Sequence, residues 1–155
     1  MKKVKECMNR EVISVQRSTS LKSILEKFKN FHRFPLVPVV SQENKLLGVV
    51  SLDNLIQIFH PTHYKLLKAI PFLDYREEIF DVELPSEIGS LIVAEDIMNR
   101  NFITVNEEEE ISRAYKLMKL HKLEFLPVVD KEGKLVGMIG IFDIIRNLFT
   151  DQGII

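Results

Sequence analysis

The chain repeats itself at a spacing of about 90 residues, and this feature limits the possible fold more than any other. Residues Met98 to Arg100 repeat Met8 to Arg10 at a spacing of 90 residues. Residues Leu126 to Val129 repeat the pattern of Val37 to Val40 at a spacing of 89 residues. The first copy therefore holds one extra residue, somewhere near Phe31 to Leu36. A doubled supersecondary unit predicts two similar halves that share a core.

Both copies have the same predicted order of elements, β-α-β-β-α. In each copy a β-branched strand is followed by a helical apolar pattern, two strands around a polar turn, and a last helix. The expected elements include first strands at 12–15 and 102–105, hairpin strands at 37–40 and 46–50, and last helices at 52–59 and 142–149. The expected apolar stripes of the first helices are Leu21, Ile24, Leu25 and Phe28, and Ile111, Ala114, Tyr115 and Met118.

Turn and cap signals support this order in the second copy. The turn Asp130 to Gly133 ends in glycine, which tolerates positive φ and so favours a hairpin. Asn106, with Glu109 three residues later, has the pattern of a capping box. We therefore expect the acidic run Glu107–Glu110 in the first helical turn, where the helix dipole favours acidic side chains.

We expect an α+β fold, an α/β sandwich in which the two repeats pack with pseudo-twofold symmetry. The expected parts are a first repeat at 1–59, an apolar and partly helical linker at 60–94, and a second repeat at 95–155. A short helix capped by Thr62 is expected in the linker. Cys7 stands where the second copy has Ile97, which predicts a buried apolar role over a reactive thiol.

Composition and charge exclude several classes of function. The 155 residues carry 21 Lys+Arg against 22 Asp+Glu, so the basic surplus of a nucleic-acid module is missing. We find no signal peptide and no apolar run of membrane-spanning length. These features predict a cytoplasmic protein without membrane insertion. We find no nucleophile–base pattern, and His60 with His63 falls short of a four-ligand zinc site, so we expect neither an enzyme nor a required cofactor or metal.

The doubled Pro-Val-Val, Lys-Leu-X-Gly and Ser-X-X-Asn/Asp patterns resemble a tandem pair of CBS domains, the Bateman module. This resemblance implies a regulatory module that binds an adenosyl ligand (AMP, ADP, ATP or S-adenosylmethionine) in clefts between the repeats. It also implies a homodimer and a regulated partner protein. The alternative is a ligand-free interaction or dimerisation module that acts as a regulatory subunit.

The family motif places a hydroxyl and a carboxylate at the start of each last helix, for phosphate and ribose respectively. The first copy keeps the hydroxyl at Ser51 but has Asn54 in place of the carboxylate. The second copy keeps the carboxylate at Asp143 but has Gly140 in place of the hydroxyl. We therefore expect clefts of unequal affinity. Ser51 and Asp143 are also ordinary capping residues without any ligand.

The resemblance also implies a set of residues that pack against the adenine base, which we call the adenine wall. Each of these residues fits an ordinary place in the hydrophobic core equally well. Its residues are Met8, Ile13, Leu36, Met98, Ile103 and Phe125. Because family geometry joins the two repeats, we expect Ser51 and Asn54 to meet Ile103, and Asp143 to meet Ile13. Arg33 resembles a phosphate-gripping residue of some members, although a solvated loop arginine is the favoured interpretation.

Overall fold

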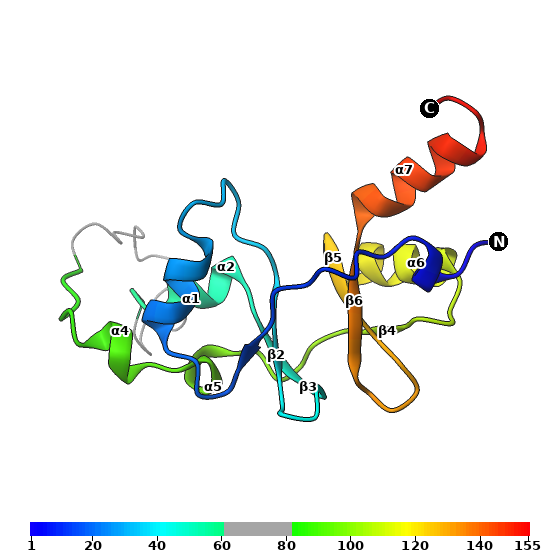
Figure 1. Ribbon diagram of the computed structural model, residues 1–155. Coiled ribbons are helices and arrows are strands. Elements are labelled where there is room, and N and C mark those ends of the chain that lie inside the picture. The colour runs from blue at the N-terminus through cyan, green and yellow to red at the C-terminus, as the bar shows by residue number, and fades with distance from the viewer. Residues whose placement is uncertain (61–81) are drawn as a thin grey trace, which may run out of the picture.

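The computed structural model describes residues 1–60 and 82–155 (Figure 1). The expected order β-α-β-β-α is confirmed in both repeats. The first repeat contains η1 (Val4–Glu6), β1 (Val15–Gln16), α1 (Leu21–Phe28), β2 (Val37–Val40), β3 (Leu46–Val50) and α2 (Leu52–Gln57). After α4 (Ile88–Leu91), the second repeat contains α5 (Ala94–Ile97), β4 (Val105–Asn106), α6 (Ile111–His121), β5 (Phe125–Val129), β6 (Leu135–Gly140) and α7 (Ile141–Asp151).

Each repeat builds one three-stranded sheet with the same topology. β1 is parallel to β2, which is antiparallel to β3, and β4, β5 and β6 follow the same arrangement. The registers also correspond, because Val15 pairs with Val39 and Val105 pairs with Val128. The α+β fold expected from the repeat is therefore confirmed.

The first strand of each repeat is shorter than predicted. Pairing is limited to Val15–Gln16 and Val105–Asn106, so the predictions of strands at 12–15 and 102–105 are wrong. The residues ahead of each short strand line the space between the repeats instead of joining a sheet.

The helices bury a narrower stripe than the apolar pattern predicts. Leu25 and Tyr115 occupy equivalent positions and are 45% and 40% exposed, so their expected place in the core is wrong. Each comes directly after a fully buried residue. Because successive side chains of a helix point in different directions, Leu25 and Tyr115 lie at the edge of the buried face. The buried stripes are Leu21, Ile24 and Phe28 in α1, and Ile111, Ala114 and Met118 in α6.

The expected cap at Asn106 is also wrong as a helix start. Asn106 Oδ1 accepts a hydrogen bond from the backbone N–H of Glu108 at 2.9 Å, and Glu109 Oε1 accepts one from that of Asn106 at 3.0 Å. These bonds close a turn ahead of the helix, because α6 begins at Ile111. The acidic run therefore lies before the helix, where Glu108 pairs with Lys3 and Lys5 at 2.8 and 2.7 Å.

The segment that opens each repeat packs on the other repeat. We call residues 3–9 the first leader and residues 93–99 the second leader. Val4 is fully buried in the core of the second repeat, and Ala94 is fully buried in the core of the first. Figure 1 shows the N-terminal segment running from β1 across to α6. The two repeats therefore complete each other's cores.

The hydrogen bonds of the two leaders obey the same pseudo-symmetry. The backbone N–H of Val4 donates to the carbonyl of Glu109, and that of Ala94 donates to the carbonyl of Thr19, both at 2.8 Å. Further along each leader, an isolated antiparallel bridge joins it to the last strand of the other repeat's hairpin. Each leader therefore packs on the opposite repeat through equivalent hydrogen bonds.

The two hairpin turns meet on the pseudo-twofold axis. The backbone N–H of Leu135 donates to the carbonyl of Asn44 at 3.0 Å, and that of Leu46 donates to the carbonyl of Gly133 at 3.3 Å. Gly133 has φ of 81°, which confirms its expected positive φ, and Asn44 takes the same role in the first repeat with φ of 66°.

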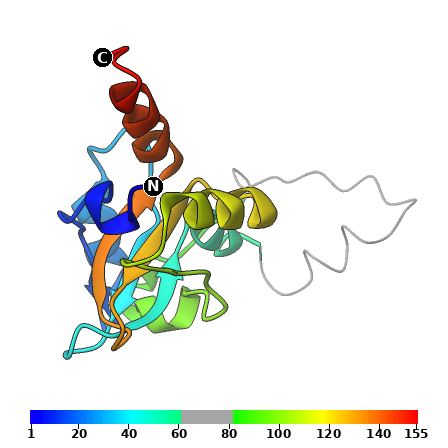
Figure 2. The same cartoon turned by 90° about the vertical axis from the view of Figure 1, so that its right-hand side faces the viewer.

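The helix α7 extends away from the sheets in both views (Figures 1 and 2). Lys2 ties its last residue, Asp151, to the N-terminal segment by an ion pair of 2.9 Å. In the part of the chain that the structure describes, no helix combines the length and apolarity needed to cross a membrane. The helix expected after Thr62 lies outside the described residues.

Candidate functional site

A cleft of about 310 Å³ lies between the repeats, and we call it cleft A. The residues that line it come from both halves of the chain: Leu36, Val49, Ser51, Asn99, Asn101, Phe102, Ile103, His121, Leu123, Phe125 and Pro127. Ser51 and Ile103 thus share one cleft, as the crossed arrangement predicts. Leu36 and Phe125 complete its apolar wall, and His121 and the two asparagines are lining residues that the sequence analysis did not identify.

Ser51 is held by its neighbour Asn54 at the start of α2. Both the backbone N–H and the hydroxyl of Ser51 donate to Asn54 Oδ1, at 2.8 and 2.9 Å, and the N–H of Asn54 donates to Ser51 Oγ at 3.4 Å. The amide oxygen of Asn54 therefore already accepts two hydrogen bonds. Asn54 therefore positions Ser51. It is not among the residues that line cleft A, so the expected meeting of Asn54 with Ile103 is not seen.

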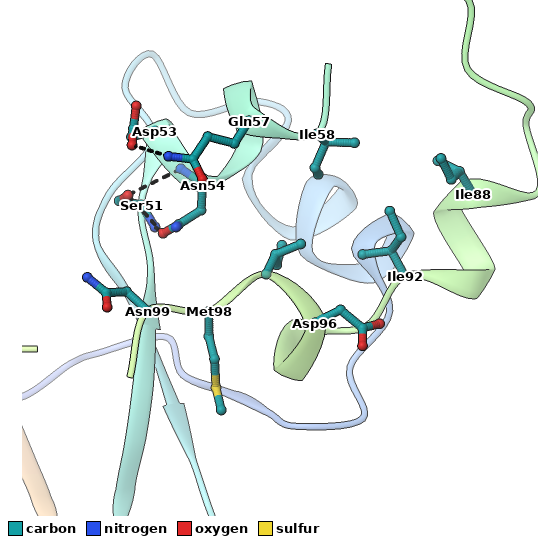
Figure 3. A pocket seen from close by; sticks show the side chains of 11 residues that line it. Ser51, Asp53, Asn54, Gln57, Ile58, Ile88, Ile92, Asp96, Met98 and Asn99 are labelled. Carbon is teal, nitrogen blue, oxygen red and sulfur yellow. Dashed lines mark hydrogen bonds between the residues drawn. The ribbon is translucent and has the colours of Figure 1, made fainter. Parts of the chain in front are cut away.

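Asn54 instead faces an outer hollow of about 770 Å³ between α2, α4 and α5. Figure 3 shows Asn54 and Gln57 on one side of it and Met98 and Asp96 on the other. Gln57 donates to Asp53 Oδ2 at 2.8 Å, so the polar side chains of α2 are largely satisfied by one another.

Met8 and Met98, both expected in the adenine wall, pack on the opposite hairpin. Met98 lies against Gly48, and Met8 lies against Gly137. Each methionine thus holds its leader on the other repeat. The described linings of clefts A and B contain neither methionine.

A second, smaller cleft of about 210 Å³ opens beside Ile13, and we call it cleft B. It is lined by Asn9, Glu11, Val12, Ile13, Phe28, Phe31, Pro35, Leu36, Phe125 and Met138. Ile13 is therefore near Leu36 and Phe125, but Asp143 is absent from the described lining. The expected meeting of Asp143 with Ile13 is not seen.

Asp143 is engaged within its own helix. Its Oδ2 accepts a hydrogen bond from the backbone N–H of Gly140 at 2.7 Å. Its Oδ1 forms an ion pair with Arg146, also at 2.7 Å. The carboxylate thus caps α7 at one oxygen and meets a cation on the next turn at the other.

The missing hydroxyl at Gly140 has a packing cause. Gly140 pairs with Phe125 in the sheet, and a Cβ at Gly140 would lie 3.0 Å from two ring atoms of Phe125. The equivalent positions in the first repeat, 89 residues earlier, are Ser51 and Leu36. The larger Phe125 therefore stands beside the smaller Gly140, and the smaller Leu36 accompanies the larger Ser51. This compensation can be read from the aligned sequences of the two repeats.

Basic side chains gather at a hollow of about 500 Å³ that adjoins both Ser51 and Phe125. Its lining includes His32, Arg33 and Lys122. Arg33 is 74% exposed and forms an ion pair of 2.7 Å with Glu124. The favoured interpretation of Arg33 as a solvated loop residue fits this exposure, and its place beside Ser51 adds a cation near cleft A.

Other reactive groups offer little chemistry here. Cys7 is buried as expected, and this burial raises the pKa of its thiol, so the nucleophilic thiolate is disfavoured. Within residues 1–60 and 82–155, no three His, Cys, Asp or Glu side chains are placed to hold a metal ion. His63 of the pair considered for metal binding lies outside the described residues.

Comparison with known proteins identifies the repeat. The family model of the CBS domain matches residues 4–61 and 93–150. An uncharacterized protein of Methanocaldococcus jannaschii is 26% identical, with 94% of this chain and 90% of that protein covered. The inosine-5′-monophosphate dehydrogenase of Aquifex aeolicus is 28% identical over 87% of this chain, which spans only 22% of that enzyme.

Solved structures share the fold over nearly the whole chain. The crystal structure of CBSX2 in complex with AMP matches with a TM-score of 0.72 and 23% identity, covering 98% of this chain and 99% of that one. The CBS domain pair of protein MJ0100, in complex with 5′-methylthioadenosine and S-adenosyl-L-methionine, matches with a TM-score of 0.65 and 20% identity, covering 97% and 98%.

Proposed function

Because the chain belongs to the CBS domain family, we propose that it is a regulatory module that binds an adenosyl ligand in cleft A. The observation that carries the proposal is the joint lining of this cleft by Ser51 of the first repeat and Ile103 of the second. The complexes of CBSX2 with AMP and of MJ0100 with adenosyl compounds support the same ligand class.

The cleft offers each part of such a ligand a fitting surface. The adenine base packs between Ile103 and the ring of Phe125, and stacking on an aromatic side chain contributes about 1–3 kcal/mol per base. The sugar and its 5′ substituent then extend toward Ser51, whose hydroxyl turns from Asn54 to the ligand. This rotation exchanges one hydrogen bond for another, so its cost is small.

Charge at the mouth of the cleft favours a phosphorylated ligand over a sulfonium compound. Arg33 and Lys122 line the hollow beside Ser51, and Glu124 is the acidic residue of its lining, paired with Arg33. A phosphate gains from these cations, whereas the positive sulfonium of S-adenosylmethionine is repelled. We therefore place AMP, ADP and ATP ahead of S-adenosylmethionine.

The second candidate function is dimerisation through α7, with or without ligand. Phe142, Ile145, Leu148 and Phe149 are exposed along this helix, and contiguous apolar patches on soluble proteins mark contact surfaces. We propose a second copy of the chain as the partner, because a twofold dimer buries the same patch on both protomers. Ligand-dependent changes at the clefts then reach a regulated partner through this dimer.

An ultraviolet spectrum and thermal unfolding test the ligand proposal. The chain has no Trp and three Tyr, so its own ultraviolet absorbance is weak. Bound adenine in a purified sample therefore adds a clear absorbance peak near 260 nm. Ligand present at about 100 times its Kd stabilises the fold by about 2.7 kcal/mol. We expect AMP and ATP to raise the melting temperature more than S-adenosylmethionine does. A protein whose absorbance near 260 nm does not exceed that of its own Tyr and Phe side chains, and whose melting temperature none of the three compounds raises at millimolar levels, contradicts the proposal and favours the dimerisation module.

A further inference from the structure

We propose that Met98 is a positioning residue for cleft A. It is buried, it packs against Gly48 of β3, and it holds the second leader on the first repeat. Met98 is absent from the described lining of the cleft, so it acts through the residues that follow it. This inference rests on the proposed function, because its readout is the affinity for AMP.

The residues that Met98 supports form one wall of cleft A. Four residues of the stretch 99–103 line the cleft: Asn99, Asn101, Phe102 and Ile103. Asn99 exchanges two backbone hydrogen bonds of 2.8 and 3.0 Å with Val49, which lines the same cleft. The Asn99 side chain also accepts a hydrogen bond of 2.9 Å from the backbone N–H of Asn101. The place of the leader therefore fixes the place of the wall.

The first leader supports cleft B in the same way. Met8 packs against Gly137, and Asn9 exchanges backbone hydrogen bonds of 2.8 and 2.9 Å with Met138. The Asn9 side chain accepts a hydrogen bond of 3.0 Å from the backbone N–H of Glu11. The described lining of cleft B includes Asn9, Glu11, Val12 and Ile13, whereas that of cleft A includes no residue of the first leader. Each leader therefore serves one cleft, and Met8 is a natural control for Met98.

The affinity of cleft A depends on how firmly the second leader is held. A ligand in this cleft contacts Val49 and the wall together only while the hydrogen bonds between Asn99 and Val49 are formed. Ligand binding therefore stabilises the held leader, and a weakened leader lowers the ligand affinity by the same factor, because coupling between two equilibria is reciprocal. Truncation of Met98 leaves a cavity beneath the leader and so weakens its hold.

Titration calorimetry with AMP on the full chain compares Met98→Ala with Met8→Ala. Both variants lose the same side chain from an equivalent contact with glycine, and urea unfolding measures how much stability each one loses. Met98→Ala is expected to weaken AMP binding about 5-fold or more, whereas Met8→Ala is expected to leave it unchanged. Met98→Leu nearly conserves the side-chain volume and is expected to keep the natural affinity.

Hydrogen exchange of the natural chain gives a second test that needs no variant. With AMP at about 100 times its Kd, exchange of the Val49 and Asn99 amides is expected to slow more than exchange of the Asn9 and Met138 amides. The two pairs occupy equivalent places in the fold, so a difference between them reports the leader that serves the occupied cleft.

The outcomes separate this inference from the proposed function. Equal weakening of AMP binding by Met98→Ala and Met8→Ala, or weakening by neither, overturns the positioning role but leaves the ligand proposal standing. Equal protection of the two pairs of amides by AMP does the same. Weakening by Met8→Ala alone overturns both the positioning role and the choice of cleft A. Failure of the natural chain to bind AMP, ATP or S-adenosylmethionine overturns the proposed function itself.

Discussion

Met98 lies directly over Gly48, and a Cβ added at Gly48 would be 2.7 Å from the Met98 sulfur. The same relationship holds between Met8 and Gly137, again at 2.7 Å. Each glycine belongs to one repeat and each methionine to the leader that opens the other. The Lys-Leu-X-Gly pattern therefore ends in glycine because a side chain from the opposite repeat occupies the space.

This packing makes Gly48→Ala destabilising. The added methyl group overlaps the Met98 side chain and the backbone carbonyl of Asn99, and overpacking of this kind costs about 1–3 kcal/mol. Urea unfolding measures the loss. Met98→Ala is expected to recover part of it in the double variant, because the two changes share one contact. Gly89→Ala on α4, where the nearest atom is the Lys22 Cβ at 3.3 Å, is the control. Equal losses at Gly48 and Gly89 contradict this packing.

The first leader is also held by charge, which predicts a dependence on pH. Hydrogen bonds from Lys3 and Lys5 lower the pKa of Glu108 from its ordinary 4.5 to about 2. Because the folded state lowers this pKa, the ion pairs contribute stability above about pH 4.5 and lose it as the pH falls toward 2. Glu108→Gln is expected to flatten the urea midpoint over this range and to reduce its sensitivity to salt. Glu132→Gln, on the hairpin turn, is the control. If Glu108→Gln keeps the pH dependence of the natural chain, Glu108 does not hold the first leader by charge.

The compensated pair Phe125 and Gly140 predicts a rescue. Gly140→Ser alone pushes its side chain into the Phe125 ring and is expected to cost about 1–3 kcal/mol of unfolding free energy. Adding Phe125→Leu recreates the Leu36–Ser51 combination of the first repeat, so the double variant is expected to regain most of this loss. Denaturant unfolding of the two single variants and the double variant measures the coupling. Additive losses contradict a direct contact between the two positions.

The exposed face of α7 predicts a twofold dimer that a charge disrupts. Leu148→Glu places a carboxylate in the middle of the apolar patch and is expected to yield a monomer. Leu91→Glu, at an exposed leucine on α4, is the matched control and is expected to keep the dimer. Sedimentation velocity distinguishes the two states. A monomeric natural chain, or a dimer that survives Leu148→Glu, contradicts α7 as the interface.

The local architecture was predictable from the sequence because the signals are local. The hairpin strands at 37–40 and 46–50 and the positive φ of Gly133 follow from β-branched runs and turn chemistry. The crossed pairing of Ser51 with Ile103 was expected only through the resemblance to CBS domain pairs, since nothing local joins two residues so distant in sequence.

The wrong predictions depend on contacts that the local pattern does not contain. The acidic run around Glu108 looks like a helix start, yet its partners Lys3 and Lys5 arrive from the other end of the chain. The place of Asp143 in a cleft was expected only from the resemblance, and its partner Arg146 is three residues away on the same helix.

The most direct measurement compares AMP binding by Ser51→Asp and Ser51→Asn. Both residues cap helices well, so both variants are expected to keep α2 and to melt near the natural chain. The aspartate places a negative charge beside the phosphate, whereas the asparagine does not. We predict that titration calorimetry finds AMP affinity lost in Ser51→Asp and largely kept in Ser51→Asn. Equal affinity in the two variants would place the phosphate elsewhere and contradict cleft A as the ligand site.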